Sequence, residues 1–188
     1  MNRIGIWGDS ITWGAWDFEM GGWVARLRHF IENYHQAERQ VYNMGIDGDK
    51  LQDVAKRFDA EYAAREPEII IFAVGINDSP HDSHPDGTML NEFEKSYSDL
   101  VAKVKGKAKQ IVIVSPTNVD DEQESSFTNA GIKPYVEATK KVAASHQLTF
   151  VDVFGLIEKK DLQYDGLHPE TGGHEKIFQE VSKALGYK

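Results

Sequence analysis

Four short polar clusters contain the residues of this chain whose types and spacing are suited to chemistry. Gly8–Ser10 ("GDS") holds a serine, and Asp165–Pro169 ("DGLHP") holds an aspartate and a histidine three residues apart. Between them along the chain lie Asn43–Gly48 ("NMGIDG") and Gly75–Asp78 ("GIND"). Acyl transfer needs a nucleophile, a base that takes its proton, a group that orients the base, and donors for the developing oxyanion. The four clusters supply a candidate for each role.

Each role is matched by a different residue. Ser10 is the candidate nucleophile, and His168 is the candidate base, because an unperturbed imidazole titrates near neutral pH. Asp165 can hold the distal nitrogen of the ring. Gly45 offers a backbone N–H that no side chain blocks, and Asn77 offers a side-chain amide. The sequence therefore predicts a Ser–His–Asp site with two oxyanion donors.

Each cluster taken alone also has an ordinary structural explanation. Gly8–Ser10 is a common helix start with an Asp or Ser N-cap. Asn43–Gly48 and Asn77 with Asp78 are common turn sequences. Asp165 and His168 are equally compatible with a helix cap and a surface histidine. Their joint occurrence, in this order and at the ends of successive strands, favours the catalytic interpretation.

The elements that position these clusters alternate along the chain. Five runs have strand length and apolar character, at Arg3–Trp7, Gln40–Asn43, Glu68–Val74, Gln110–Ser115 and Thr149–Val153. Residues with helical spacing separate them, and the last helix is expected from about Glu175 to Leu185. Five strand–helix units predict an α/β fold with a five-stranded parallel sheet covered by helices on both faces. We expect one domain over residues 1–188, with the polar clusters at the carboxyl edge of the sheet, where such sheets bind ligands.

Composition excludes several other classes of function. The formal net charge is −9, which disfavours binding to nucleic acid or to an anionic membrane surface. The chain has no cysteine, so disulfides, zinc–thiolate sites and thiol nucleophiles are excluded. No stretch approaches the roughly 20 apolar residues of a membrane span. The N-terminus also lacks the apolar region of a signal peptide, so we expect a cytoplasmic protein.

Taken together, the four clusters resemble the sequence blocks of the GDSL-type esterases and lipases, also called SGNH hydrolases. The resemblance extends from Gly8 to Pro169. It implies a flavodoxin-like, three-layer α/β/α sandwich and hydrolysis of carboxylic esters without metal or cofactor. It also implies that Ser10, His168 and Asp165 form the triad, and that Gly45 and Asn77 bind the oxyanion.

Two positions depart from the family pattern. Ile11 stands where the family name has Leu, which is a conservative change. Asp47 places a charge inside the second block, where it either points away from the site or disfavours acidic substrates. The implied partner is a small-molecule ester, and the polar character of the segments after the third and fourth strands favours short acyl groups.

Two other functions remain open from the sequence. An acyltransferase would use the same triad with an alcohol acceptor, and a non-catalytic ligand-binding module would use the fold without the chemistry. Around the site, Trp13 and Trp16 are equally compatible with a substrate pocket and with helix packing. We expect His81–Asp86 and Asp120–Glu124 to form polar, solvated loops.

Overall fold

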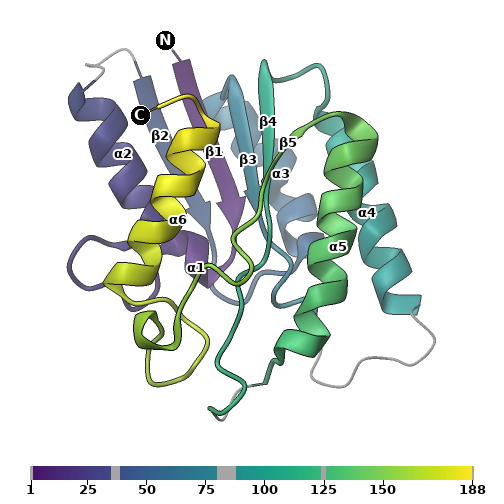
Figure 1. Cartoon of the computed structure of the whole chain (residues 1–188). Helices are drawn as coiled ribbons and strands as arrows, with labels where there is room; N and C mark the ends of the chain where they lie inside the picture. The colour runs from purple at the N-terminus through teal and green to yellow at the C-terminus, as the bar shows by residue number, and fades with distance from the viewer. Residues whose placement is uncertain (1, 35–38, 80–87, 124–125, 188) are drawn as a thin grey trace.

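A computed structural model describes residues 2–34, 39–79, 88–123 and 126–187. Within these residues, five parallel strands form one sheet in the order β2-β1-β3-β4-β5 (Figure 1). All five predicted strands are present, as β1 (Asn2–Gly8), β2 (Arg39–Gly45), β3 (Ile69–Ala73), β4 (Gln110–Val114) and β5 (Thr149–Val151). Because β1 pairs in parallel with both β2 and β3, the loops that follow these three strands open at the same edge of the sheet.

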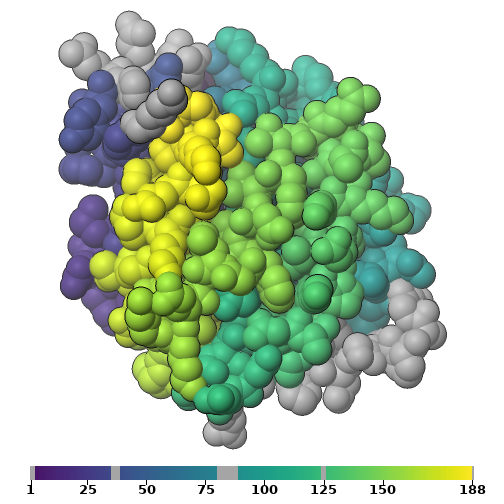
Figure 2. All heavy atoms as spheres, viewed as in Figure 1, coloured from purple at the N-terminus to yellow at the C-terminus, as the bar shows by residue number. Residues whose placement is uncertain are grey.

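Helices cover both faces of this sheet, as predicted. They are α1 (Ser10–Trp13), α2 (Gly22–Tyr34), α3 (Leu51–Arg65), α4 (Thr88–Val104), α5 (Asn129–His146) and α6 (Thr171–Ala184), with a short 3-10 helix at Lys159–Asp161. Helices α2 and α6 pack on one face, while α3 and α4 pack on the other (Figure 1). Helix α5 contributes side chains to both apolar layers. On the side shown in Figure 2, the surface is formed largely by α6, the segment that leads into it, and α5.

Side-chain alternation along the strands creates the two apolar layers. Ile4 and Ile6 of β1 pack toward α2 and α6, whereas Trp7 packs toward α3 and α4. In β3, Ile71 follows the first direction and Phe72 the second. Strands with apolar residues on both faces are typical of a parallel sheet that is buried between helices. The α/β/α sandwich expected from the sequence is therefore the observed fold.

One helix boundary differs from the prediction, and the helix after β1 is short. Helix α1 is a separate single turn, because Gly14 ends it in a left-handed conformation at φ 99°. Helix α6 begins at Thr171, four residues before the predicted start. Gly172 and Gly173 weaken the helical signal there, but the Thr171 hydroxyl donates to Asp17 and fixes the start through a contact distant in sequence.

The sequence analysis also predicted a polar loop and no membrane span. The predicted loop His81–Asp86 lies outside the described residues. Among the helices of the described ranges, none combines the length and the apolar character needed to cross a bilayer.

Candidate active site

Ser10 is the first residue of α1, directly after β1. Asp9 caps this helix, and its Oδ1 accepts from the backbone N–H of Ile11 at 3.0 Å. Gly8 makes the tight exit from β1 possible, because a Cβ there would lie 2.1 Å from Thr12 Oγ1 and 2.3 Å from the Ala73 carbonyl. The serine is thereby placed at the carboxyl edge of the sheet. Its helix has only four residues, too few to build the macrodipole of a longer helix.

The segment Asp165–His168 forms a turn that its own aspartate holds. Asp165 Oδ1 accepts from the backbone N–H groups of Leu167 at 2.9 Å and His168 at 3.0 Å. Asp165 Oδ2 lies 2.6 Å from His168 Nδ1. One carboxylate therefore shapes the turn and also orients the imidazole, which explains why the two residues stand three positions apart.

The structure brings Ser10, His168 and Asp165 together. His168 Nε2 lies 2.9 Å from Ser10 Oγ, although the two residues are 158 positions apart in sequence. With Nδ1 facing a carboxylate, the hydrogen-bond network assigns the ring proton to Nδ1 and leaves Nε2 as the acceptor from the serine hydroxyl. Burial alone would raise the pKa of Asp165, but hydrogen bonds from the His168 side chain and from two backbone N–H groups outweigh it and lower that pKa.

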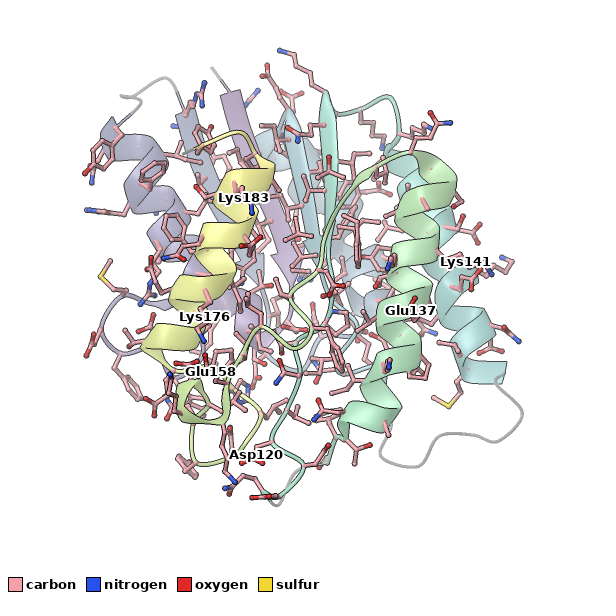
Figure 3. All side chains as sticks on the ribbon, viewed as in Figure 1. Asp120, Glu137, Lys141, Glu158, Lys176 and Lys183 are labelled. Carbon is pink, nitrogen blue, oxygen red and sulfur yellow. The ribbon has the colours of Figure 1, made fainter. Side chains whose placement is uncertain are left out.

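The loop that carries His168 is fastened on both sides. Lys176 of α6 contacts Glu158 at 2.9 Å (Figure 3). It also contacts Asp161 at 2.7 Å. On the other side, the Asp120 N–H donates to the Gly166 carbonyl at 2.8 Å. The Asp120 carboxylate, 9% exposed, pairs with Lys159. The prediction of a solvated loop was therefore wrong for Asp120, because its partners come from a segment distant in sequence.

Asn77 follows β3 and is partly buried. Its Nδ2 donates to the Asp49 carbonyl at 3.0 Å, which fixes the orientation of the amide. An amide nitrogen carries two N–H groups, so one donor remains after this contact. The next residue, Asp78, accepts from the Leu51 N–H at 3.0 Å and joins the same turn to the start of α3.

Gly45 and Gly48 have different surroundings in the second cluster. The Gly45 N–H donates to Asn43 Oδ1 at 2.9 Å, so the donor that the sequence analysis assigned to the oxyanion is engaged. A Cβ on Gly45 would lie 2.3 Å from the Trp13 nitrogen, so this glycine seats α1 against β2. Gly48 has φ +75°, open space around it and no hydrogen bond from its N–H to any described residue.

Gly48 also lies in the part of the turn that borders the site. Its neighbour Asp47 lines a pocket together with His168, while its other neighbour, Asp49, accepts from Asn77. The sequence analysis selected the first glycine of this cluster and did not consider the second. The signal was available in the Asp-Gly pair, which favours a turn with positive φ.

Arg57 of α3 is a second residue that sequence reasoning missed. Its guanidinium donates to the Gly8 carbonyl at 3.2 Å and pairs with Asp49 and Glu61, each at 2.7 Å. Glu61 in turn accepts from the indole N–H of Trp7. One side chain thus joins the strand end before Ser10 to the turn that contains Gly48.

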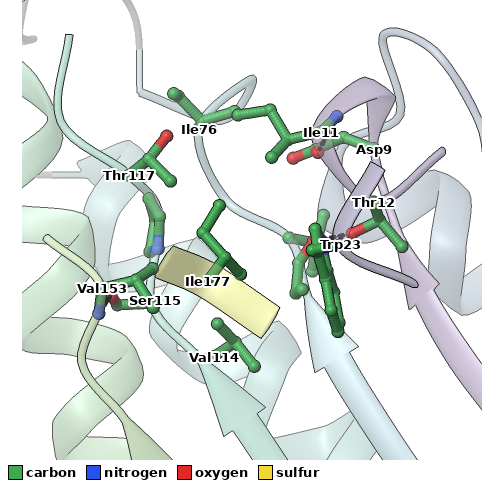
Figure 4. Close-up of a pocket in the computed structure, with 13 residues that line it drawn as sticks. Asp9, Ile11, Thr12, Trp23, Ile76, Val114, Ser115, Thr117, Val153 and Ile177 are labelled. Atoms are coloured by element: carbon green, nitrogen blue, oxygen red, sulfur yellow. Dashed lines mark hydrogen bonds between the residues drawn. The ribbon is translucent and has the colours of Figure 1, made fainter. Parts of the chain in front are cut away.

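A small cavity of about 20 Å³ lies on the core side of α1 (Figure 4). Asp9 and Thr12 line it from the first strand end, and Ser115 and Thr117 line it from the segment after β4. Burial raises the pKa of Asp9 to about 7, against the lowering effect of its backbone hydrogen bonds. Burial likewise raises the pKa of Asp78 to about 6. A space of this size has room for about one water molecule.

A larger surface pocket of about 610 Å³ opens beside the imidazole. Trp13, Trp16, Phe18 and Asp47 line it together with His168. The two tryptophans are exposed rather than packed in the core, so they belong to this pocket. By contrast, Trp7 and Trp23 are fully buried. Among the described residues, no group of three or more His, Asp or Glu side chains is placed to hold a metal ion.

Comparisons with known proteins identify relatives of this arrangement. A model of the GDSL-like lipase/acylhydrolase family matches residues 6–176. The acetylxylan esterase of Geobacillus stearothermophilus is 24% identical over 182 residues, which cover 89% of this chain and 82% of that protein. A GDSL esterase/lipase of Arabidopsis thaliana is 24% identical over 207 residues, which cover 97% and 85% respectively.

Solved structures show the same fold. LAE5, an α/β hydrolase from the metagenome of Lake Arreo in Spain, has a TM-score of 0.81 and 25% identity, with 98% of this chain and 95% of that chain covered. Axe2, an acetylxylan esterase from Geobacillus stearothermophilus, has a TM-score of 0.82 and 23% identity, with 100% and 95% covered. Catalytic mutants of Axe2 change a serine, an aspartate and a histidine, the last two three positions apart. The chain therefore belongs to the GDSL-like lipase/acylhydrolase family and is a carboxylic ester hydrolase.

Proposed function

We propose that the chain hydrolyses esters of short acyl groups through a covalent acyl-Ser10 intermediate. The observation that carries this proposal is the continuous hydrogen-bonded series from Ser10 Oγ through the His168 ring to Asp165, with contacts of 2.9 and 2.6 Å. This arrangement supplies a nucleophile, a base and an orienting group within hydrogen-bond reach of one another.

Each half of the reaction moves one proton through His168. Nε2 takes the hydroxyl proton as Ser10 Oγ bonds to the ester carbon, and the same proton then passes to the alcohol as its C–O bond breaks. Water next attacks the acyl-serine and gives a proton to Nε2. The bond between the acyl carbon and Ser10 breaks, and His168 returns a proton to the serine. Asp165 stabilises the imidazolium that forms in both halves.

Three N–H groups can bind the oxyanion in this proposal. They are the backbone N–H of Ser10, the backbone N–H of Gly48 and the second N–H of the Asn77 amide. The support for Gly48 in place of Gly45 is that the Gly45 N–H is engaged by Asn43. Donors that are held in place before the reaction stabilise developing charge without reorganising at the moment of attack.

The proposed acyl preference rests on the space and chemistry near Ser10. The cavity behind α1 is about 20 Å³, which is too small for a fatty chain. The segments after β3 and β4 contribute the polar side chains Asn77, Asp78 and Thr117 at this edge, beside apolar ones such as Ile76 and Pro116. The relative that is an acetylxylan esterase acts on a short acyl group carried by a carbohydrate, which makes acetyl esters of sugars a candidate substrate class here.

The test is the hydrolysis of methyl acetate and p-nitrophenyl acetate by the wild type and by Ser10→Ala. We expect the variant to lose nearly all turnover on both esters while its melting temperature stays close to that of the wild type. Turnover at the wild-type rate in a folded Ser10→Ala sample would overturn the proposal. A methyl decanoate kcat/KM above that of methyl acetate would overturn the acyl preference.

A further inference from the structure

The loop between α1 and α2 holds an array of exposed apolar side chains beside the imidazole. The exposed fractions are 58% for Trp13, 45% for Trp16, 87% for Phe18 and 45% for Met20. Trp13, Trp16 and Phe18 line the pocket of about 610 Å³ that also contains His168. The Trp16 ring meets the His168 ring edge-on, with centroids 6.1 Å apart. We call Trp13, Trp16 and Phe18 the aromatic platform.

The loop that carries this platform is fixed at its centre. Asp17 is buried and accepts from Gly22 N at 2.9 Å, from the Thr171 hydroxyl at 2.9 Å and from the Arg26 guanidinium. Burial alone would raise the pKa of Asp17, but the hydrogen bond from Arg26 and those from its other donors hold it well below its usual range. The exposed aromatic rings therefore stand on an ordered support.

The two ends of the loop meet closely. A Cβ on Gly14 would lie 2.1 Å from the Gly21 carbonyl, and one on Gly22 would lie 2.3 Å from the Gly14 Cα. Compact surface loops with close ends are frequently functional.

Trp16 has a positive φ although it does not end a helix, so its backbone is strained. Three described non-glycine residues have positive φ: Trp16 at 66°, Glu66 and Gln147. Glu66 and Gln147 end α3 and α5, where a left-handed residue is ordinary. Trp16 ends no helix, and its carbonyl accepts from Gln163 Nε2 at 3.2 Å. Strain of this kind in a bulky residue is concentrated at functional sites.

The position of the platform determines which part of a substrate it meets. In acyl transfer the leaving alcohol takes its proton from the base, so the alcohol portion of the ester must lie within reach of His168 Nε2. This step rests on the function proposed above. The pocket that contains His168 and the aromatic platform is therefore the pocket for the alcohol portion.

Asp47 indicates the chemistry of that alcohol. Its carboxylate lines the same pocket and is exposed, and it has no hydrogen bond or ion pair with another described residue. A carboxylate accepts protons from hydroxyl groups and repels anions. Flat aromatic faces with an adjacent acceptor suit a ring that has apolar C–H faces and hydroxyl groups on its edge.

We infer that the aromatic platform and Asp47 form a subsite for the neutral pyranose ring of an acylated sugar, which is held as the leaving group. The ring stacks on Trp13 or Trp16, and its hydroxyls donate to Asp47. Phe18 extends the platform away from His168.

The experiment compares two acetyl esters that differ only in the alcohol. Acetylated xylooligosaccharides present the sugar, and methyl acetate presents the same acyl group without a ring. We expect Trp13→Ala and Phe18→Ala to lower kcat/KM on the oligosaccharides by roughly tenfold each, mainly through KM, because a stacked ring contributes about that factor. Methyl acetate has no ring to stack, so its kcat/KM should fall less than that of the oligosaccharides in both variants. Tyr34→Ala is the matched control, since this ring is exposed but does not line the pocket.

Asp47 gives a second, independent variant. Asp47→Ala should weaken oligosaccharide turnover by roughly tenfold, whereas Asp47→Asn, which retains an acceptor oxygen, should lose less. Equal losses of kcat/KM on methyl acetate and on the oligosaccharides would overturn the sugar subsite. A loss of kcat/KM confined to methyl decanoate would also overturn it, because the platform would then bind an acyl chain. Failure of the proposed function itself would give a different result, because the Ser10→Ala variant would then hydrolyse methyl acetate at the wild-type rate.

Discussion

The Asp165 carboxylate performs two tasks at the scale of single residues. One oxygen holds the turn through two backbone N–H groups, and the other holds the His168 ring. The two tasks can be separated by chemistry, because an asparagine keeps the oxygen that accepts from the backbone but removes the charge beside the imidazolium. The spacing of Asp165 and His168 is thus a consequence of local backbone geometry as well as of the reaction.

Asp165→Asn should therefore fold normally and lose activity. The amide favours the wrong ring tautomer and no longer stabilises the charged imidazole, a change that costs up to about 10⁴-fold in kcat in another serine hydrolase. Steady-state kinetics and a thermal melt on the same sample test this. An unchanged kcat would show that His168 works without Asp165.

Asn77→Ala tests the side-chain oxyanion donor. We expect kcat to fall about 10²–10³-fold, or roughly 3–4 kcal/mol, with little change in KM, because the donor acts mainly in the transition state. If the amide only fastens the turn through Asp49, then the melting temperature should fall while kcat per folded molecule is retained. Measuring both quantities on one preparation distinguishes the two roles.

At the scale of elements, the site depends on strand ends that a helix holds in register. Arg57 reaches from α3 to the Gly8 carbonyl at the end of β1 and to Asp49 in the turn after β2. Asp49 also accepts from Asn77, which follows β3. Three successive strand ends are therefore connected through one arginine, which makes Arg57 a positioning residue for the site.

Arg57→Met should lower both stability and kcat. The substitution keeps much of the apolar stem but leaves the partly buried Asp49 and Glu61 carboxylates without a cation, and hydrogen bonds to charged groups contribute about 1.5–3 kcal/mol each. We expect kcat to fall about tenfold or more as the turn with Gly48 shifts. Lys56→Met on the same helix is the control, because Lys56 is exposed and pairs only with Asp53 in the described residues. Equal kcat values in the two variants would contradict the positioning role.

The elements themselves were largely predictable, because apolar runs and helical spacing are local signals. The strands, the parallel sheet and the grouping of Ser10, Asp165 and His168 follow from them. Contacts between distant segments were not predictable. The start of α6 depends on Thr171 meeting Asp17. Asn43 engages the Gly45 N–H from two residues away, but the Thr12 and Trp13 carbonyls of α1 orient its amide. Arg57 acts through a contact to the Gly8 carbonyl, 49 positions away in sequence.

At the scale of the whole molecule, the core side of the site buries a carboxyl group. Asp9 is 3% exposed, and its pKa is raised to about 7 by burial. The folded protein therefore keeps a proton on Asp9 at pH values where the unfolded chain, with an ordinary carboxyl, has lost it. The contribution of Asp9 to the free energy of unfolding is therefore highest in acid, and it decreases as the pH rises from about 4 to about 7.

Asp9→Asn should remove this dependence. Asparagine stays neutral and retains an oxygen for the Ile11 N–H, so the variant should gain stability relative to wild type as the pH rises from 4 to 7, by at most ~1.4 kcal/mol per pH unit. Above pH 7 the difference should be constant. Urea unfolding at pH 4, 5, 6, 7 and 8 measures it, and a difference that is flat or decreases across this range would show that Asp9 ionises freely in the folded protein.

Covalent labelling tests most directly whether Ser10 is the nucleophile. The wild-type protein is treated with a fluorophosphonate, the loss of esterase activity is followed, and the modified peptide is mapped by mass spectrometry, with Ser10→Ala as the control. We predict that one phosphonyl group attaches to Ser10 in proportion to the activity lost, and that Ser10→Ala is not labelled. Loss of activity with Ser10 unmodified, or full activity with Ser10 labelled, would contradict the account.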